Sequence, residues 1–168
     1  MIHVCSLAAL PAVVRLTRAS HVLTVMANVD QVQRPLSILE ANHLKVLMDD
    51  ITEPIDGYVA PSKEHVEQVL KFVRSWDRVA PLVVHCYAGV SRSTASAFAA
   101  ACALNPHREE IAIARQIRAA SPIASPNRLI VSLADRALRR EGRMLRALDE
   151  IGPASLMVEG QPFRIELD

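Results

Sequence analysis

A cysteine and an arginine with five residues between them could act together on an oxyanion. Cys86 ends an apolar run, Arg92 follows it, and residues 86–92 are called the cysteine loop below. A loop between a buried strand and a buried helix turns its backbone N–H groups inward at the positive end of the helix, so it can bind phosphate or a similar anion. The same field would stabilise Cys86 as a thiolate, which is the nucleophilic form of cysteine.

The residues around this pair fit the same chemistry. The guanidinium of Arg92 can hold two phosphate oxygens through a reaction. Gly89 permits a tight turn and the close approach of a ligand. Ser93 can donate a hydrogen bond to the thiolate, and His85 is expected to orient the loop rather than to react. The candidate residues in contact with the anion are Tyr87, Ala88, Gly89, Val90, Ser91 and Arg92.

The flanking elements must position this loop. Residues 81–86 are almost wholly apolar without alternation, which is typical of a central parallel strand, and residues 93–104 predict a helix buried on all sides. Further strands are expected at 1–7, 21–27 and 43–48, and helices at 11–19, after the N-cap Ser62, at 108–120 and at 126–140. This order predicts an α/β fold with a mainly parallel sheet flanked by helices in three layers, whose ligands bind at the carboxyl ends of the strands.

The segment resembles the signature loop of the cysteine-dependent protein tyrosine phosphatases: His-Cys, five residues, Arg, then Ser or Thr. Residues 85–93, His-Cys-x-Ala-Gly-Val-Ser-Arg-Ser, are similar to the dual-specificity branch and its small bacterial-type members in particular, and the wider resemblance spans residues 44–140. The resemblance implies a phosphatase-like sandwich and a phosphomonoester hydrolase without cofactor or metal. It implies a phosphocysteine intermediate on Cys86, phosphate binding by Arg92 and an aspartate as general acid.

Three aspartates are candidates for that acid. Asp50 follows the strand expected at 43–48, at the edge of the sheet where the cysteine loop also lies. Asp56 is closer to the family spacing, in an Asp-Gly-x-x-x-Pro-Ser stretch with one residue extra. Asp49 alternates to the opposite side if the strand continues. We favour Asp50, keep Asp56 as the alternative, and prefer both to Asp49.

Composition narrows the classes of function. The 168 residues, 51% hydrophobic and 22% charged, predict one domain with a substantial core. A net charge of +1 and 4% aromatic residues do not favour a nucleic-acid or anionic-membrane partner. Three cysteines without CxxC spacing argue against a disulfide framework or a zinc site, and no apolar run reaches the ~18 residues of a membrane span. We therefore expect a cytoplasmic protein, and the resemblance implies that it acts on a phosphorylated protein or a small phosphomonoester.

The chain is expected to divide into a catalytic domain, residues 1–140, and a C-terminal extension of the same domain, residues 141–168. In that extension Gly152 and Pro153 stop the last helix, and residues 155–158 could pair with 163–167 as a hairpin. The pairs Glu109-Glu110 and Arg139-Arg140 are expected on solvated faces.

The substrate preference and two alternatives stay open at this point. The interior of the cysteine loop carries no Lys or Arg, which favours phosphotyrosine, with phosphoserine or phosphothreonine also accepted, over a highly charged head group. One alternative is a catalytically weak, phosphatase-like binding module. The other is a different thiolate enzyme for oxyanions, such as a sulfurtransferase or an arsenate reductase.

Overall fold

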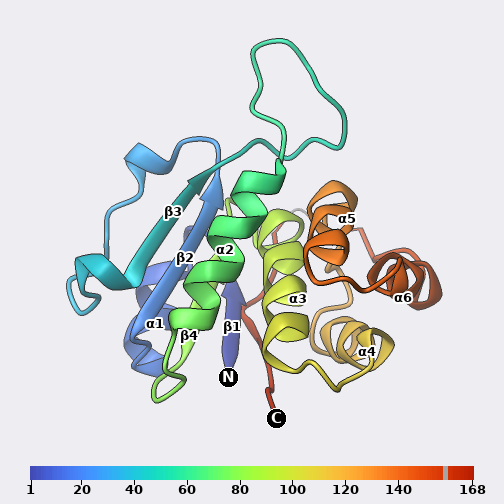
Figure 1. The fold of residues 1–168 in the computed structure, drawn as a ribbon. Helices are drawn as coiled ribbons and strands as arrows, with labels where there is room; N and C mark the ends of the chain where they lie inside the picture. The colour runs from blue at the N-terminus through green and yellow to red at the C-terminus, as the bar shows by residue number, and fades with distance from the viewer. Residues whose placement is uncertain (157–158) are drawn as a thin grey trace.

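A five-stranded sheet forms the centre of the computed structural model, which describes residues 1–156 and 159–168 (Figure 1). The strands of this part of the chain are β1 (Ile2–Cys5), β2 (His21–Met26), β3 (His43–Leu47), β4 (Leu82–His85) and β5 (Phe163–Ile165). Their order is β3-β2-β4-β1-β5, and only β5 runs antiparallel to its neighbour. The predicted α/β fold with a mainly parallel sheet is therefore confirmed.

Helices cover the two faces of the sheet unequally. The α-helices are α1 (Leu10–Thr17), α2 (Lys63–Ser75), α3 (Arg92–Leu104), α4 (Glu110–Ala120), α5 (Arg128–Ala137) and α6 (Arg143–Ile151), and the short 3-10 helices are η1 (Val29–Gln31) and η2 (Glu40–Asn42). Helix α1 packs on one face with the side chains of Val22 and Val83. Helices α2 to α6 share the core on the opposite face, where α3 lies in the centre with nearly every residue buried (Figure 1).

The sequence explains where α2 starts. Ser62 is its N-cap and accepts a hydrogen bond from the N–H of His65, while the ring of His65 accepts one from the N–H of Ser62. Such a reciprocal pair satisfies two of the free N–H groups at a helix start. The chain between β3 and α2 projects beyond the rest of the molecule in Figure 1.

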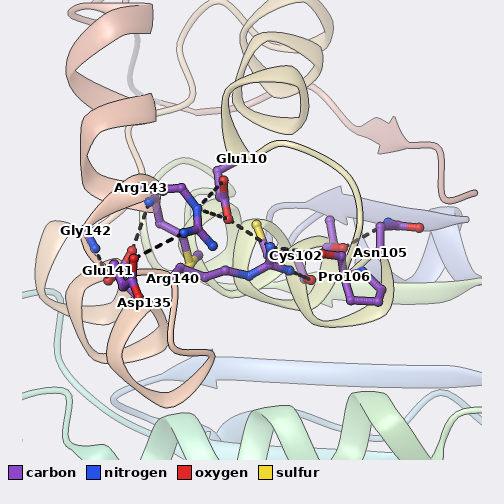
Figure 2. Close-up of polar contacts among 11 residues, drawn as sticks. Cys102, Asn105, Pro106, Glu110, Asp135, Arg140, Glu141, Gly142 and Arg143 are labelled. Atoms are coloured by element: carbon purple, nitrogen blue, oxygen red, sulfur yellow. Dashed lines mark hydrogen bonds and ion pairs between the residues drawn. The ribbon is translucent and has the colours of Figure 1, made fainter.

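A buried ion-pair cluster joins the helices at the far end of α3 (Figure 2). Glu110 of α4 pairs with Arg140 at 2.9 Å and with Arg143 of α6 at 3.2 Å, and Arg140 also donates to the carbonyl of Cys102 at 2.7 Å. The side chains of Glu110 and Arg140 are 5% and 10% exposed. The prediction that these two residues lie on solvated faces is therefore wrong, because the approach of α4, α5 and α6 encloses both charges.

Residues 141–156 contain a helix of their own. Helix α6 begins after Gly142, and the carboxylate of Asp135 accepts hydrogen bonds from the N–H groups of Gly142 and Met144. The last strand, β5, pairs with β1 at the edge of the sheet. Residues 157 and 158, which belong to the first half of the expected hairpin, lie outside the described residues.

None of the described helices has the length and apolar composition that crossing a bilayer requires.

Candidate active site

Cys86 lies directly after β4, at the carboxyl edge of the parallel strands. Its side chain is buried, and its Sγ atom lies 3.1 Å from the Oγ atom of Ser93, in the first turn of α3. The loop between β4 and α3 thus brings the hydroxyl group of Ser93 next to the thiol of Cys86. A hydroxyl at this distance can stabilise a thiolate by donating a hydrogen bond to it.

In the backbone of the cysteine loop, most carbonyl groups accept hydrogen bonds, whereas successive N–H groups donate none within the described chain. Surrounding segments donate to the carbonyl oxygens: Leu7 to Tyr87 at 3.0 Å, Gly160 to Ala88 at 2.9 Å, Ser125 to Val90 at 3.0 Å and Asn127 to Ser91 at 3.4 Å. Within the described part of the chain, none of the N–H groups of residues 87–91 donates to a protein acceptor. A concave run of free N–H groups is a binding site for an anion.

Helix α3 adds its positive end to the same place. Its N-cap, Ser91, makes no side-chain hydrogen bond to the first turn, so the side chain leaves the N–H groups at the helix start uncapped. Arg92 is the first residue of α3 and is 9% exposed. Its Nη1 atom donates to the carbonyl of Met48 at 2.9 Å, while its buried Nε atom has no hydrogen-bond partner in the described structure. The guanidinium is thus fixed at one nitrogen and has an unpaired N–H group at another.

Asp50 is the candidate acid that the structure brings to the loop. Its Oδ2 atom lies 3.8 Å from Nε of Arg92. Its Oδ1 atom accepts hydrogen bonds from Ser91 Oγ at 2.7 Å and from Asn127 Nδ2 at 2.8 Å. The carboxylate is 37% exposed, so it can contact both the loop and a bound molecule.

The other two aspartates lie elsewhere. Asp49 exchanges hydrogen bonds with Val59, since its N–H donates to the carbonyl of Val59 and its Oδ2 atom accepts from the N–H of Val59, both at 2.7 Å. Asp49 therefore closes the base of the projecting loop between β3 and α2. Asp56 is exposed within that loop and has no hydrogen bond or ion pair to any residue of the described chain.

His85 holds the loop from beneath. It is fully buried, and burial lowers its pKa to about 4, so the ring is neutral near pH 7. The contact between Nδ1 and the carbonyl of Cys86, at 3.3 Å, requires Nδ1 to donate. The other ring nitrogen then accepts from Thr24 Oγ1 at 2.6 Å, and Thr24 accepts from the Nε2 atom of His43 at 2.8 Å. This series of hydrogen bonds fixes the carbonyl group of Cys86.

Gly89 is required where the loop meets β1. Its φ is +74°, and a Cβ atom there would lie 2.8 Å from the carbonyl carbon of Cys5 and from the nitrogen of Ser6. Gly160 approaches the loop from the other terminus, where a Cβ atom would meet the carbonyl oxygen of Gly89 at 2.9 Å. The two ends of the chain therefore pack directly on the cysteine loop.

Sequence reasoning misses several of these neighbours. Asn127 is not among the candidate site residues, although its position as the N-cap of α5 after a proline is a usable signal. Thr24 offers a signal too, because it is polar within a fully buried strand. Nothing in the sequence points to Leu7 or Gly160, which contact the loop from distant parts of the chain.

The two remaining cysteines lie outside the cysteine loop. Cys5 and Cys102 are buried, and burial raises the pKa of each thiol to about 12, which keeps them protonated. In residues 1–156 and 159–168, no three His, Cys, Asp or Glu side chains gather as metal ligands would.

A protein-family model matches residues 12–105, more than half of the chain. Its description is "Polymorphic toxin system, DSP-PTPase phosphatase". The match includes Asp50, Cys86, Arg92 and Ser93, and it excludes the first residues of the chain and everything after Asn105. No curated protein matches the chain in sequence.

Solved structures of phosphatases share the fold. DUSP15 superposes with a TM-score of 0.64 at 19% identity, over 92% of this chain and 94% of that one. Cydia pomonella PTP-2 phosphatase gives 0.63 at 18% identity, over 80% and 84%. PTPMT1, solved in complex with PI(5)P, gives 0.62 at 14% identity, over 88% and 94%. At these low sequence identities, the superpositions show that the chain shares the fold of these phosphatases and nothing more.

Proposed function

This chain belongs to the DSP-PTPase phosphatase family of polymorphic toxin systems and is a protein-tyrosine-phosphatase-like hydrolase, and from that premise we propose that it hydrolyses phosphomonoesters through a phosphocysteine on Cys86. The observation that carries the proposal is the cysteine loop itself. The N–H groups of residues 87–91 have no acceptor within the described chain, and they directly follow Cys86, whose Sγ atom lies 3.1 Å from the Oγ atom of Ser93.

The first step forms one bond and breaks one. The thiolate of Cys86 attacks phosphorus, and the bond between phosphorus and the leaving oxygen breaks. The free N–H groups of residues 87–91 and the guanidinium of Arg92 bind the phosphoryl oxygens, which carry negative charge in both steps. Asp50 gives its proton to the leaving oxygen, so an alcohol or a phenol departs.

The second step returns the enzyme to its starting state. A water molecule attacks the phosphorus of the phosphocysteine, Asp50 accepts a proton from that water, and the bond between sulfur and phosphorus breaks. Ser93 donates a hydrogen bond to the departing thiolate, which makes the thiolate a better leaving group. Inorganic phosphate is the second product.

Two features of the structure support Asp50 as the acid in this scheme. It is the candidate within 4 Å of Arg92, and Ser91 and Asn127 hold its carboxylate from two different elements. Asp56 makes no hydrogen bond or ion pair to the cysteine loop within the described chain.

We propose a phosphorylated protein as the substrate, with phosphotyrosine accepted best. PTPMT1, which shares the fold, was solved with a phosphoinositide bound. In the present chain the loop residues 87–91 include no lysine or arginine to bind the extra phosphates of such a head group. A single phosphoryl group on a peptide matches the charge of this site better.

The proposal is tested by hydrolysis of an aryl phosphate in the presence of a metal chelator. The wild-type protein should release phosphate, and Cys86→Ser should release none. Cys102→Ser is the control, since it makes the same chemical change to a buried thiol at the far end of α3. Equal activity of Cys86→Ser and wild type would refute the mechanism.

A further inference from the structure

A cleft beside the cysteine loop has a composition that the hydrolysis itself does not explain. Its volume is about 400 Å³, and it is lined by Leu7, Ala8, Tyr87, Ala88 and Glu159, which we call the side cleft. Tyr87 and Ala88 belong to the cysteine loop, so the side cleft borders the loop whose N–H groups would bind the phosphoryl group. Whatever occupies it must be attached to that group or lie next to it.

The walls of the side cleft are apolar and aromatic. Leu7 and Ala8 come from the segment between β1 and α1, and Tyr87, which is 69% exposed, also lines the cleft. A large aromatic side chain exposed at a loop of this kind is available to a ligand. Its face can contact an aliphatic chain or a cation.

One charged residue lines the side cleft, and it is acidic. Within the described chain Glu159 has no lysine, arginine or histidine within 4 Å of its carboxylate. It accepts a hydrogen bond from Ser6 Oγ at 2.6 Å. The next residue, Gly160, donates its N–H to the carbonyl of Ala88 at 2.9 Å. These two contacts hold an unneutralised carboxylate at the edge of a phosphate-binding loop.

This arrangement is unexpected for a site that binds a dianion. A carboxylate next to the loop repels the phosphoryl group and any polyanionic substrate. The same carboxylate attracts a positive charge, and the apolar walls accept the methylene groups of a long side chain. Lysine and arginine are the side chains with both properties.

We propose that the side cleft binds a lysine or arginine close in sequence to the phosphorylated residue, so that the preferred substrates are basic phosphopeptides. The inference rests on the proposed function and assigns its substrate class. Ser6, Leu7, Ala8 and Glu159 all lie outside residues 12–105, the range matched by the family model. The residues that select the substrate would thus come from the two ends of the chain, whereas the residues that hydrolyse it would come from the middle of the chain.

The test compares phosphotyrosine peptides that differ at one position. Arginine, norleucine or glutamate is placed in turn at each of the three positions on either side of the phosphotyrosine, and kcat/KM is measured by phosphate release. For at least one position we expect arginine to exceed glutamate by about tenfold, the size of one exposed ion pair combined with a contact to an aromatic ring.

Two variants assign this preference to Glu159. Glu159→Gln retains an acceptor for Ser6 and should reduce the ratio of arginine to glutamate to about twofold or less, while Glu159→Lys should invert it. Glu40→Gln is the matched control, because it removes one exposed carboxylate at η2, at the opposite edge of the sheet, and should keep the wild-type ratio.

The inference and the proposed function fail in different ways. If the aryl phosphate is hydrolysed but arginine and glutamate peptides react equally at all positions, or if Glu159→Lys keeps the wild-type preference, the side cleft does not bind a cationic side chain. If the aryl phosphate is not hydrolysed, the proposed function fails. Binding of the same peptides with a non-hydrolysable phosphonate in place of phosphotyrosine then tests the side cleft alone, and equal affinities for the arginine and glutamate peptides would overturn the inference.

Discussion

The Oδ2 atom of Asp50 lies 3.8 Å from the Nε atom of Arg92, so the groups that we propose as general acid and phosphate ligand are neighbours. Asp50 reaches this place from the end of β3, and Arg92 from the start of α3. Asn127, the N-cap of α5, holds the carboxylate from a third element. Three separate parts of the chain thus converge on one carboxyl group.

The first prediction concerns the general acid. Asp50→Asn should lower kcat by ~10²–10⁴-fold for substrates with poor leaving groups, because the alkoxide or phenolate then leaves without a proton. The loss should be smaller for an aryl phosphate whose phenol is strongly acidic. Steady-state rates against a series of substituted phenyl phosphates measure this dependence. Asp56→Asn, in the exposed loop, is the control, and a larger loss for Asp56→Asn than for Asp50→Asn would reverse the assignment.

The second prediction concerns the hydroxyl beside the thiol. Ser93→Ala should slow the second step by about 10- to 100-fold, the value of one hydrogen bond to a charged group, so that phosphocysteine accumulates. Rapid-mixing kinetics should then show a burst of phenol followed by slow turnover. Ser96 lies one turn further along α3, and its buried Oγ atom has no hydrogen-bond partner within the described chain. The control variant Ser96→Ala should therefore keep wild-type kinetics. Equal behaviour of the two variants would contradict a role for Ser93.

The third prediction separates backbone strain from close packing. Gly89 and Gly57 both have positive φ, +74° and +82°, but a Cβ atom at Gly89 would overlap Cys5 and Ser6, whereas one at Gly57 would meet nothing within 4 Å. Gly89→Ala should displace the cysteine loop and reduce kcat/KM by about 100-fold or more. Gly57→Ala should lower the melting temperature only slightly and retain activity. Normal activity of Gly89→Ala would mean that the loop does not need this packing.

The fourth prediction is a pH dependence of stability. Burial lowers the pKa of His85 to about 4, against an ordinary value of 6.5. Between these values the unfolded chain binds a proton that the folded chain does not, so the free energy of unfolding should fall as the pH drops from 6.5 towards 4. By about pH 5 the loss from His85 alone should approach ~2 kcal/mol. Burial also lowers the pKa of His43 to about 4, which adds to the loss in the same direction.

Two measurements check this pH dependence. Urea denaturation at about pH 7.5 and about pH 5 gives the change in the free energy of unfolding, which should be smaller in His85→Gln and unaltered in His107→Gln, a change at an exposed position. An NMR titration of the wild-type His85 ring needs no variant. A midpoint near the ordinary pKa of 6.5 would contradict the neutral, hydrogen-bonded ring described above.

The part of the site that the sequence predicts well is contiguous. Cys86, Arg92 and Ser93 fall within one strand–loop–helix unit, whose apolar flanks define where the loop begins and ends. Local spacing is therefore enough to predict that the thiol of Cys86 and the hydroxyl of Ser93 lie together, as their 3.1 Å distance shows. Asp50 is predictable for a related reason, because the carboxyl ends of parallel strands meet at one edge of a sheet.

The contacts that the sequence does not predict join distant segments. The bond between Gly160 and Ala88 depends on β5 pairing with β1, and three residues of strand carry too weak a pattern to predict their partner. The expected exposure of Glu110 and Arg140 is wrong for the same reason. Charged residues on a helix are normally exposed to solvent. Glu110 and Arg140 are buried because α4 and α6 pack together around them.

The most direct test of the proposed mechanism is the identity of the residue that carries the phosphoryl group. Ser93→Ala mixed with an aryl phosphate and quenched in acid should hold one phosphoryl group per chain, and peptide mass spectrometry should locate it on Cys86. The double variant Cys86→Ser/Ser93→Ala should hold none. A phosphoryl group on another residue, or steady hydrolysis by wild type with no phosphocysteine at any time, would contradict the central claim.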